Sequence, residues 1–196
     1  AGEPDLTAMA ALHRSAYSAG HFMALLPEPV LAEYYRLFLG GGSRILIADT
    51  PSADGVAPVA AGFAVFGTDL GRRINQFKRE HRAAIWRTAI AHPLMAVGKV
   101  LATTLGRETP HDPAPWLLLS IAVSGSRRGV GTALLREMLH IAEREGQHRL
   151  GLYVRHANVS AINAYLRTGF RIVASLADQY YMESSVPSSP SPSFSR

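Results

Sequence analysis

The chain has 196 residues, of which 47% are hydrophobic and 18% charged, a composition typical of a single globular domain. It contains no cysteine, which excludes disulfides, thiolate zinc sites and a cysteine nucleophile. No run of about 18 apolar residues is present, so no membrane span is expected, and the formal net charge of +5 favours an anionic ligand such as a phosphate-bearing cofactor.

The first 66 residues predict two helices and then a pair of strands. Apolar residues recur at helical spacing in 5–18, and the segment 28–39 has Pro29 in its first turn and three glycines after its end. The apolar runs 44–48 and 59–66 flank turn-forming residues and predict a β-hairpin. The first residues carry Glu3, Pro4 and Asp5 instead of a basic and then apolar signal segment, which favours a cytoplasmic location.

Residues 71–107 differ in character from their surroundings. The pattern predicts two helices separated at His92-Pro93, inserted between the hairpin and the next strand. Within this insertion Glu80 is the only acidic residue, and it stands against a set of basic ones: Arg72, Arg73, Lys78, Arg79, Arg82, Arg87, Lys99 and Arg107.

The last third alternates strands and helices, which indicates an α/β layout. Strands are predicted at 116–123, 148–154, 170–174 and 179–183, and helices at 131–145 and 159–167. We interpret residues 1–183 as one domain, and the Ser/Pro-rich residues 184–196 as a disordered tail.

A glycine-rich loop, residues 124–131, joins the apolar strand 116–123 to the following helix. Glycines let the backbone turn sharply, and the first amides of a helix have no partner within it. With the positive end of the helix dipole, such amides form an anion site suited to a pyrophosphate, to which Arg127 and Arg128 add charged donors. The loop lacks the P-loop lysine and the three-glycine dinucleotide spacing. A purely structural turn is the alternative interpretation.

A second motif follows the strand 148–154. Asn158, Ala161, Tyr165, Gly169 and Phe170 are spaced as Asn, two residues, Ala, three residues, Tyr, three residues, Gly-Phe. Together with the glycine loop, this motif resembles the GNAT superfamily of N-acyltransferases, strongly over 116–182 and more weakly over 5–66. The resemblance implies an α/β (α+β) fold: a mixed, mostly antiparallel central sheet with one parallel, splayed strand pair, flanking helices and, here, the helical insertion.

The resemblance also implies the activity and its cofactor. An acetyl group would pass from acetyl-coenzyme A (acetyl-CoA) to a primary amine by direct attack, without a covalent enzyme intermediate and without a metal. The cofactor would lie where strands 116–123 and 148–154 separate, so that backbone groups of Ile121, Ala122 and Val123 could bind its pantetheine arm. An amide near Val123 could stabilise the charge that develops on the acetyl oxygen.

Two registers of the pyrophosphate loop are open. Counted back from the helix, the Arg/Gln position of the family falls on Ser126; counted forward from the strand, it falls on Arg128. In both registers the pyrophosphate would be held by the backbone amides of one stretch: Arg127, Arg128, Gly129, Val130, Gly131 and Thr132.

Three residues of the second motif have roles implied by the resemblance. Tyr165 stands at the position of the general acid that protonates the departing thiolate; the alternative is that its ring only packs under the cofactor. Asn158 either binds the cofactor arm or caps the helix that follows it. Asn163 either reaches the cofactor or faces solvent.

The general base is not identified by the sequence. Strand 116–123 has no acidic residue, although many relatives carry one there. Ser120 could position a water that relays the proton, and Asp69 and His156 are alternatives. The opening helices often form the acceptor side of the family, and here they carry His13, Tyr17 and His21.

Besides an enzyme acting on a small-molecule or peptide amine, the sequence is compatible with other activities and partners. One is a catalytically idle acyl-CoA-binding module with a regulatory role, which the missing strand acid favours. Another is a binder of nucleic acid or anionic membranes through the basic insertion, but the insertion has few aromatic residues, so no nucleic acid is expected. The insertion could instead cover the acceptor site and select an acidic or phosphate-bearing acceptor, or mediate a homodimer.

Overall fold

A computed structural model describes residues 1–17, 21–51, 59–93, 112–125 and 129–185. Its centre is one six-stranded sheet in the order β1-β2-β3-β4-β6-β5. All neighbouring strands are antiparallel except β3 and β4, which confirms the predicted mixed, mostly antiparallel sheet with one parallel pair. The strands are β1 (Ser43–Thr50), β2 (Val59–Gly67), β3 (Trp116–Val123), β4 (Arg149–Arg155), β5 (Arg171–Ser175) and β6 (Gln179–Ser185).

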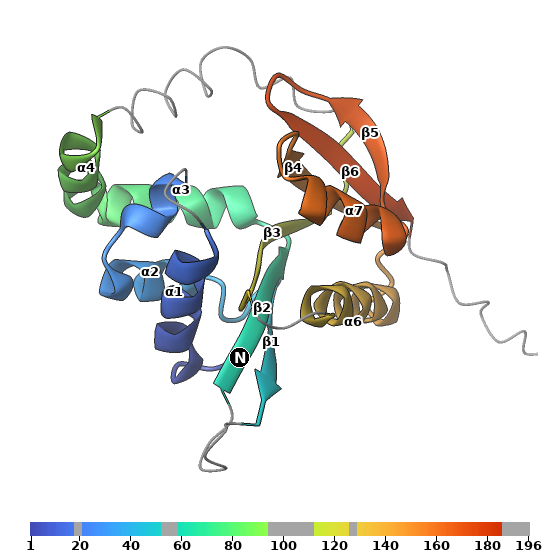
Figure 1. Cartoon of the computed structure of the whole chain (residues 1–196), viewed down its shortest axis with the longest axis horizontal. Helices are drawn as coiled ribbons and strands as arrows, with labels where there is room; N and C mark the ends of the chain where they lie inside the picture. The colour runs from blue at the N-terminus through green and yellow to red at the C-terminus, as the bar shows by residue number, and fades with distance from the viewer. Residues whose placement is uncertain (18–20, 52–58, 94–111, 126–128, 186–196) are drawn as a thin grey trace, which may run out of the picture.

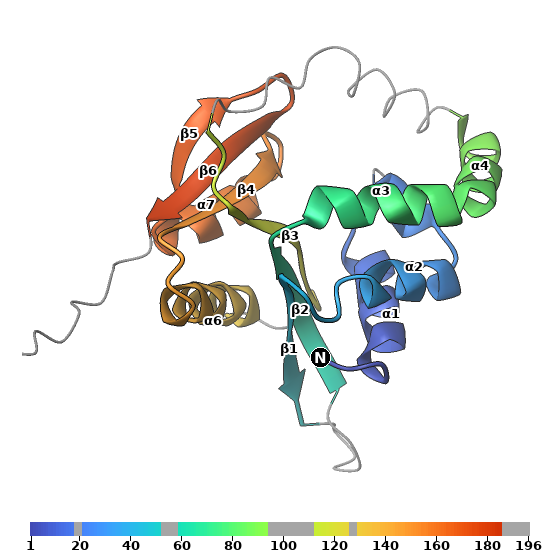
Figure 2. The same ribbon diagram turned by 180° about the vertical axis from the view of Figure 1, so that it is seen from behind.

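Helices cover both faces of this sheet and form two cores (Figure 1). One face carries α1 (Asp5–Ala16), the 3-10 helix η1 (Phe22–Leu25), α2 (Glu28–Arg36) and α3 (Leu70–Glu80), whose apolar residues pack on β2 and β3. The other face carries α6 (Val130–Arg144) and α7 (Val159–Arg167), which pack on β3, β4 and β6. Figure 2 shows the same two layers from behind, with the sheet between them.

The described part of the basic insertion contains two helices, separated by a break that the sequence does not predict. α3 ends at Glu80 and α4 (Arg82–Ala91) begins two residues later, because His81 takes a non-helical conformation. α4 ends at Ala91 and His92 leaves the helical conformation, so the predicted break at His92-Pro93 is confirmed; residues 94–107 of the insertion lie outside the described residues. Among its basic side chains, Arg73 has a structural role, because its guanidinium donates to the carbonyls of Leu37 and Gly40.

The carboxyl-terminal strand is longer than the sequence predicted. β6 continues to Ser185, two residues beyond the predicted strand 179–183, and Ser184 is buried. The remainder of the proposed tail, 186–196, lies outside the described residues. None of the helices in the described part of the chain is long and apolar enough to cross a membrane.

β3 contains a bulge that exchanges its two faces. Its register on β2 shifts between the pairs Val65–Ser120 and Phe66–Leu118, so that Leu119 has no residue opposite it. Before the bulge Leu118 packs in the core under α6 and α7, whereas after it Ala122 packs in the core under α1 and α2. A strand with strict alternation would place both residues on the same face.

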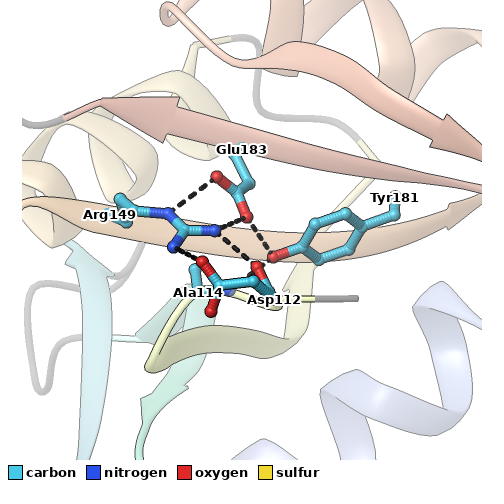
Figure 3. A network of polar contacts seen from close by, with 5 residues as sticks. All are labelled: Asp112, Ala114, Arg149, Tyr181 and Glu183. Carbon is cyan, nitrogen blue, oxygen red and sulfur yellow. Dashed lines mark hydrogen bonds and ion pairs between the residues drawn. The ribbon is translucent and has the colours of Figure 1, made fainter. Parts of the chain in front are cut away.

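A polar network holds the amino-terminal ends of β3 and β4 together (Figure 3). Arg149 on β4 forms two hydrogen bonds to the carboxylate of Glu183 on β6, at 2.8 and 3.1 Å, and a further ion pair to Asp112. The buried hydroxyl of Tyr181 donates to Glu183 at 2.6 Å and accepts from the amide of Ala114 at 2.7 Å. The segment that leads into β3 is thus attached to β4 and β6 at this end of the pair.

Candidate functional site

The parallel pair β3–β4 is paired over a short length only. Its register begins at Trp116–Leu150 and ends at Leu118–Leu152. Beyond this point β3 continues on β2 as far as Val123, and β4 continues on β6 as far as its own end. The described strands therefore separate toward their carboxyl ends, in agreement with the predicted splay, and the polar network around Arg149 lies at the closed end.

The hydrogen-bond pattern of β3 shows which backbone groups face the separation. The amide of Ser124 donates to the carbonyl of the directly opposite Ala61 at 2.8 Å. Hydrogen-bonded and non-bonded pairs alternate along an antiparallel ladder, so the backbone groups of Ser124, Ala122 and Ser120 face β2. Those of Ile121 and Val123 must then face β4, from which β3 has already separated. We call this side of β3, from Ile121 to Val123, the open edge.

α6 begins next to the open edge. Gly129 precedes its first residue with a φ of +91°, a conformation that favours glycine, and the amide of Ala133 is the first to bond back, to the carbonyl of Gly129. The amides of Val130, Gly131 and Thr132 therefore precede the hydrogen bonds of the helix and are available to an anion. Ser126, Arg127 and Arg128, between which the two loop registers differ, lie outside the described residues.

A glycine in β2 brings the start of α6 close to the sheet. A Cβ atom on Gly62 would lie 2.9 Å from Cγ1 of Val130 and 3.0 Å from both the carbonyl oxygen of Ala122 and Cγ1 of Val123. A larger residue would separate the first turn of α6 from β3. Gly62 therefore sets the spacing between the helix amides and the open edge, a role that no sequence motif indicates.

The second motif lies on α7, at the other side of the separation. Asn158 caps this helix, because its Oδ1 accepts from the amide of Ala161 at 3.2 Å, as one of its two predicted roles required. Asn163 is exposed, whereas Tyr165 is buried and its ring lies against Phe170, with 5.8 Å between the centroids. Burial, and then the neighbouring Tyr17, raise the pKa of Tyr165, so its hydroxyl keeps its proton at neutral pH.

A buried chain of polar groups connects α1 and α2 to β3. Nδ1 of His13 lies 2.5 Å from the hydroxyl of Tyr35, which lies 3.5 Å from Oγ of Ser120. Oγ of Ser120 lies 3.0 Å from the hydroxyl of Tyr17, which donates to the carbonyl of Ile121 at 3.0 Å. Four side chains thus lead to the open edge, and we refer to them as the His13–Tyr17 chain.

The titratable groups in this chain are held uncharged. Burial, and then the proximity of His21, lower the pKa of His13 to about 3. Burial raises the pKa of Tyr17, although its bonds to Ser120 and Ile121 act in the opposite direction, and burial raises the pKa of Tyr35 further still. At neutral pH the chain therefore consists of a neutral imidazole and protonated phenols.

Sequence reasoning named Ser120, His13 and Tyr17 but missed Tyr35, which joins two of them. Tyr35 belongs to the apolar face of α2 and carries no motif, so only its three-dimensional contacts reveal it. The other proposed bases lie elsewhere. Asp69 is exposed and pairs with Arg72 near the closed end, and His156 follows β4 with its ring 4.2 Å from that of Tyr180.

The described residues contain no cluster of His, Asp or Glu side chains that could hold a metal ion. The groups that would bind the implied cofactor are instead backbone amides and carbonyls. The open edge offers amides and carbonyls without a β4 partner, as a pantetheine arm requires, and the first turn of α6 beside it offers amides, as a pyrophosphate requires. The residues present therefore fit acetyl-CoA.

The fold agrees with that of known acetyltransferases, each at low identity. The ribosomal-protein-S18-alanine N-acetyltransferase from Escherichia coli is 18% identical with a TM-score of 0.57, covering 100% of this chain and 96% of that one. The PaiA N-acetyltransferase from Thermoplasma acidophilum, solved with coenzyme A, is 16% identical with a TM-score of 0.56, covering 94% and 95%. The Salmonella typhimurium protein yncA, solved with its cofactor acetyl-CoA, is 16% identical with a TM-score of 0.56, covering 100% of this chain and 96% of that one.

Sequence comparison with curated proteins gives no match, but comparison with protein families does. The acetyltransferase (GNAT) family matches residues 58–170, which is more than half of the chain and includes β2, β3, α6, β4 and α7. The chain therefore belongs to the GNAT family of acetyltransferases, which confirms the predicted activity class, acyl-CoA-dependent acetyl transfer with acetyl-CoA as cofactor.

Proposed function

We propose that this chain transfers an acetyl group from acetyl-CoA to a primary amine by direct attack at the open edge. The observation that carries the proposal is the early end of the β3–β4 ladder, which leaves the backbone of Ile121 and Val123 facing a space between the strands. Acetyl-CoA, when bound, supplies the thioester carbon that the amine attacks. If β3 and β4 did not separate, the amides and carbonyls of Ile121 and Val123 would form hydrogen bonds with β4.

The residues that would hold the cofactor come from three neighbouring elements. Ile121 and Val123 would bind the pantetheine arm, whereas Ala122 between them has backbone groups that face β2 and would not; the Val123 amide would donate to the acetyl oxygen as negative charge develops on it. The start of α6 would bind the pyrophosphate through Gly129, Val130, Gly131 and Thr132, with Arg127 and Arg128 as further donors. From α7, Asn158 and Asn163 would reach the cofactor arm.

Tyr165 would act as the general acid on the cofactor side. Its raised pKa keeps the phenol protonated, and its place on α7 puts it across the separation from the His13–Tyr17 chain. As the C–N bond forms and the C–S bond breaks, Tyr165 would donate its proton to the departing thiolate, and the attacking nitrogen would lose a proton on the acceptor side. Ser120 lies on that acceptor side, bonded to Tyr17.

A thiol-release assay with acetyl-CoA and a library of primary amines tests this proposal, together with calorimetric titration of CoA. We expect release with at least one amine and a fall in kcat of about 100-fold for Tyr165→Phe at little change in CoA affinity. Tyr180→Phe on β6 is the matched control and should stay near wild type. CoA binding without release on any amine would favour the idle acyl-CoA-binding module, and no binding at all would reject both.

A further inference from the structure

The six-stranded sheet consists of two halves that share few backbone hydrogen bonds. β1, β2 and β3 pair with one another through antiparallel ladders, as do β4, β6 and β5. The parallel ladder that joins the two halves is shorter and runs from the pair Trp116–Leu150 to the pair Leu118–Leu152. The separation of β3 from β4 is therefore the angle between two halves of the sheet, and this angle depends on the contacts at the closed end.

The two halves are joined at the closed end on both faces of the sheet. On the face beneath α6 and α7, side chains from both halves pack in one core, which includes Leu118, Leu152 and Met182. Side chains alternate between the faces of a strand, so Gly151 and Tyr181, the neighbours of Leu152 and Met182, lie on the opposite face. The polar network of Figure 3 lies on that opposite face and contains Tyr181.

Tyr181 reaches from one half of the sheet to the other across β4. It belongs to β6, yet its hydroxyl accepts a hydrogen bond of 2.7 Å from the amide of Ala114, which precedes β3 on the far side of β4. The ring passes over Gly151, where a Cβ atom would lie 2.6 Å from the hydroxyl oxygen and 3.0 Å from Cε2 of the ring. The position of Tyr181 therefore requires a glycine at residue 151.

The contacts of Tyr181 form part of a closed ring. Its hydroxyl donates to Glu183 at 2.6 Å, and Arg149 of β4 donates to the same carboxylate at 2.8 Å. Arg149 also donates to the carbonyl oxygen of Asp112 at 2.6 Å, so the ring returns to the segment before β3. Hydrogen bonds in such a network restrain one another. The ring therefore opposes rotation of one half of the sheet against the other.

We infer that Tyr181 is a positioning residue for the cofactor: by crossing β4 it fixes the angle at which β3 and β4 separate, and hence the width of the separation at the open edge. The inference rests on the proposed function, in which acetyl-CoA contacts β3 in one half of the sheet and α7, which follows β4, in the other. A strand rises about 3.3 Å per residue, so a rotation of about 5° at Leu118 shifts Val123 by about 1 Å. A displacement of about 1 Å is enough to impair a binding or catalytic geometry.

The angle can be measured without a ligand, because the chain contains no native cysteine. Spin labels on Asp49→Cys in β1 and Ser175→Cys in β5 mark the open end of each half, at two exposed positions. Tyr181→Phe keeps the ring and removes its hydrogen bonds, so we expect a broader distribution of label distances by double electron–electron resonance. Tyr180→Phe, the preceding residue of β6, is the matched control and should leave the distribution unchanged. An unchanged distribution in folded Tyr181→Phe would overturn the inference.

Cofactor binding gives a second readout, which distinguishes positioning from a general loss of stability. At a temperature where the variant is fully folded, we expect Tyr181→Phe to bind CoA about 10-fold more weakly in calorimetric titration. ADP carries the pyrophosphate without the pantetheine arm, and its affinity, measured by competition with CoA, should stay near wild type because it depends on the start of α6. Equal weakening of both ligands would show loosening of the whole fold and contradict the inference.

A second variant disturbs the same contact from β4. Gly151→Ala places a methyl group against the Tyr181 hydroxyl, so we expect the same broader label distances and the same loss of CoA affinity. Gly71→Ala, where the Cβ meets nothing within 4 Å, is its control. If the wild type binds no CoA, the proposed function itself fails. Normal CoA affinity in both Tyr181→Phe and Gly151→Ala would overturn this inference alone.

Discussion

The hydroxyl of Tyr17, just beyond the end of α1, donates to the main-chain carbonyl of Ile121 on β3 across 3.0 Å. The two residues are separated by 104 positions in the chain, and the bond joins the end of α1 to the strand that would hold the cofactor. It also occupies one of the two carbonyls that the open edge presents. The cofactor arm is therefore left mainly with the amides of this edge and the carbonyl of Val123.

Tyr17→Phe should weaken both catalysis and stability. It removes the donor to Ile121 and the acceptor of Ser120, both in partly buried hydrogen bonds, so we expect the free energy of unfolding to fall by about 1–3 kcal/mol in chemical denaturation. We expect kcat/KM to fall about 10-fold, equivalent to about 1.4 kcal/mol of transition-state stabilisation, with CoA affinity retained. Unchanged kinetics in the folded variant would show that Tyr17 serves the fold alone.

Gly62→Ala should weaken cofactor binding from a distance. Its new Cβ would lie 2.9 Å from Cγ1 of Val130, so the first turn of α6 must move away from β3. We expect CoA to bind about 10-fold more weakly by calorimetry and stability to fall by about 1–3 kcal/mol, the usual effect of overpacking. Gly71→Ala, where the Cβ meets nothing within 4 Å, is the control and should bind CoA normally.

Two substitutions at Asn158 separate its roles. Asn158→Ala removes the cap on the amide of Ala161 and should cost about 1 kcal/mol of stability, whereas Asn158→Asp keeps an acceptor there and should be stable. If Asn158 also donates its amide to the cofactor arm, CoA binds more weakly to both variants. Normal CoA affinity in Asn158→Asp would leave capping as its whole function.

The network around Glu183 should make stability sensitive to acid. Partial burial alone would raise the pKa of Glu183, but hydrogen bonds from Arg149 and Tyr181 outweigh it and lower the pKa. A lowered folded-state pKa stabilises the fold above the ordinary value of about 4.3, and this contribution is lost as pH falls through the folded-state value. In denaturation experiments, the stability gap between wild type and Glu183→Gln should therefore be constant near neutrality and shrink below about pH 4.

Much of this architecture is predictable because local patterns encode it. A nearly unbroken apolar run identifies β3, the glycine-rich loop identifies the start of α6, and apolar alternation identifies β4; the motif from Asn158 to Phe170 identifies the family and hence the parallel pair. The N-cap role of Asn158 is one of the two roles that its residue type and position predict, and the structure confirms it. These features depend on neighbours a few residues apart.

The rest depends on contacts between distant segments. The bulge at Leu119 leaves no trace in a strand that is apolar on both faces, because hydrophobic residues fit either register. Tyr35 resembles any core residue of α2 until its hydroxyl is seen between His13 and Ser120. The helix break at His81 is not predicted, since a histidine carries no strong stop signal, whereas the end of α4 before His92-Pro93 is marked by its proline.

The packing of β3 at the open edge also has a consequence for cooperativity. Ala122 is part of the core beneath α1 and α2, whereas Ile121 and Val123 on either side of it pack against the core beneath α6. A ligand that immobilises the open edge must therefore restrain both helical layers at once. Amide hydrogen exchange should slow in α1 and in α6 together when CoA is added, although the two helices lie on opposite sides of the sheet.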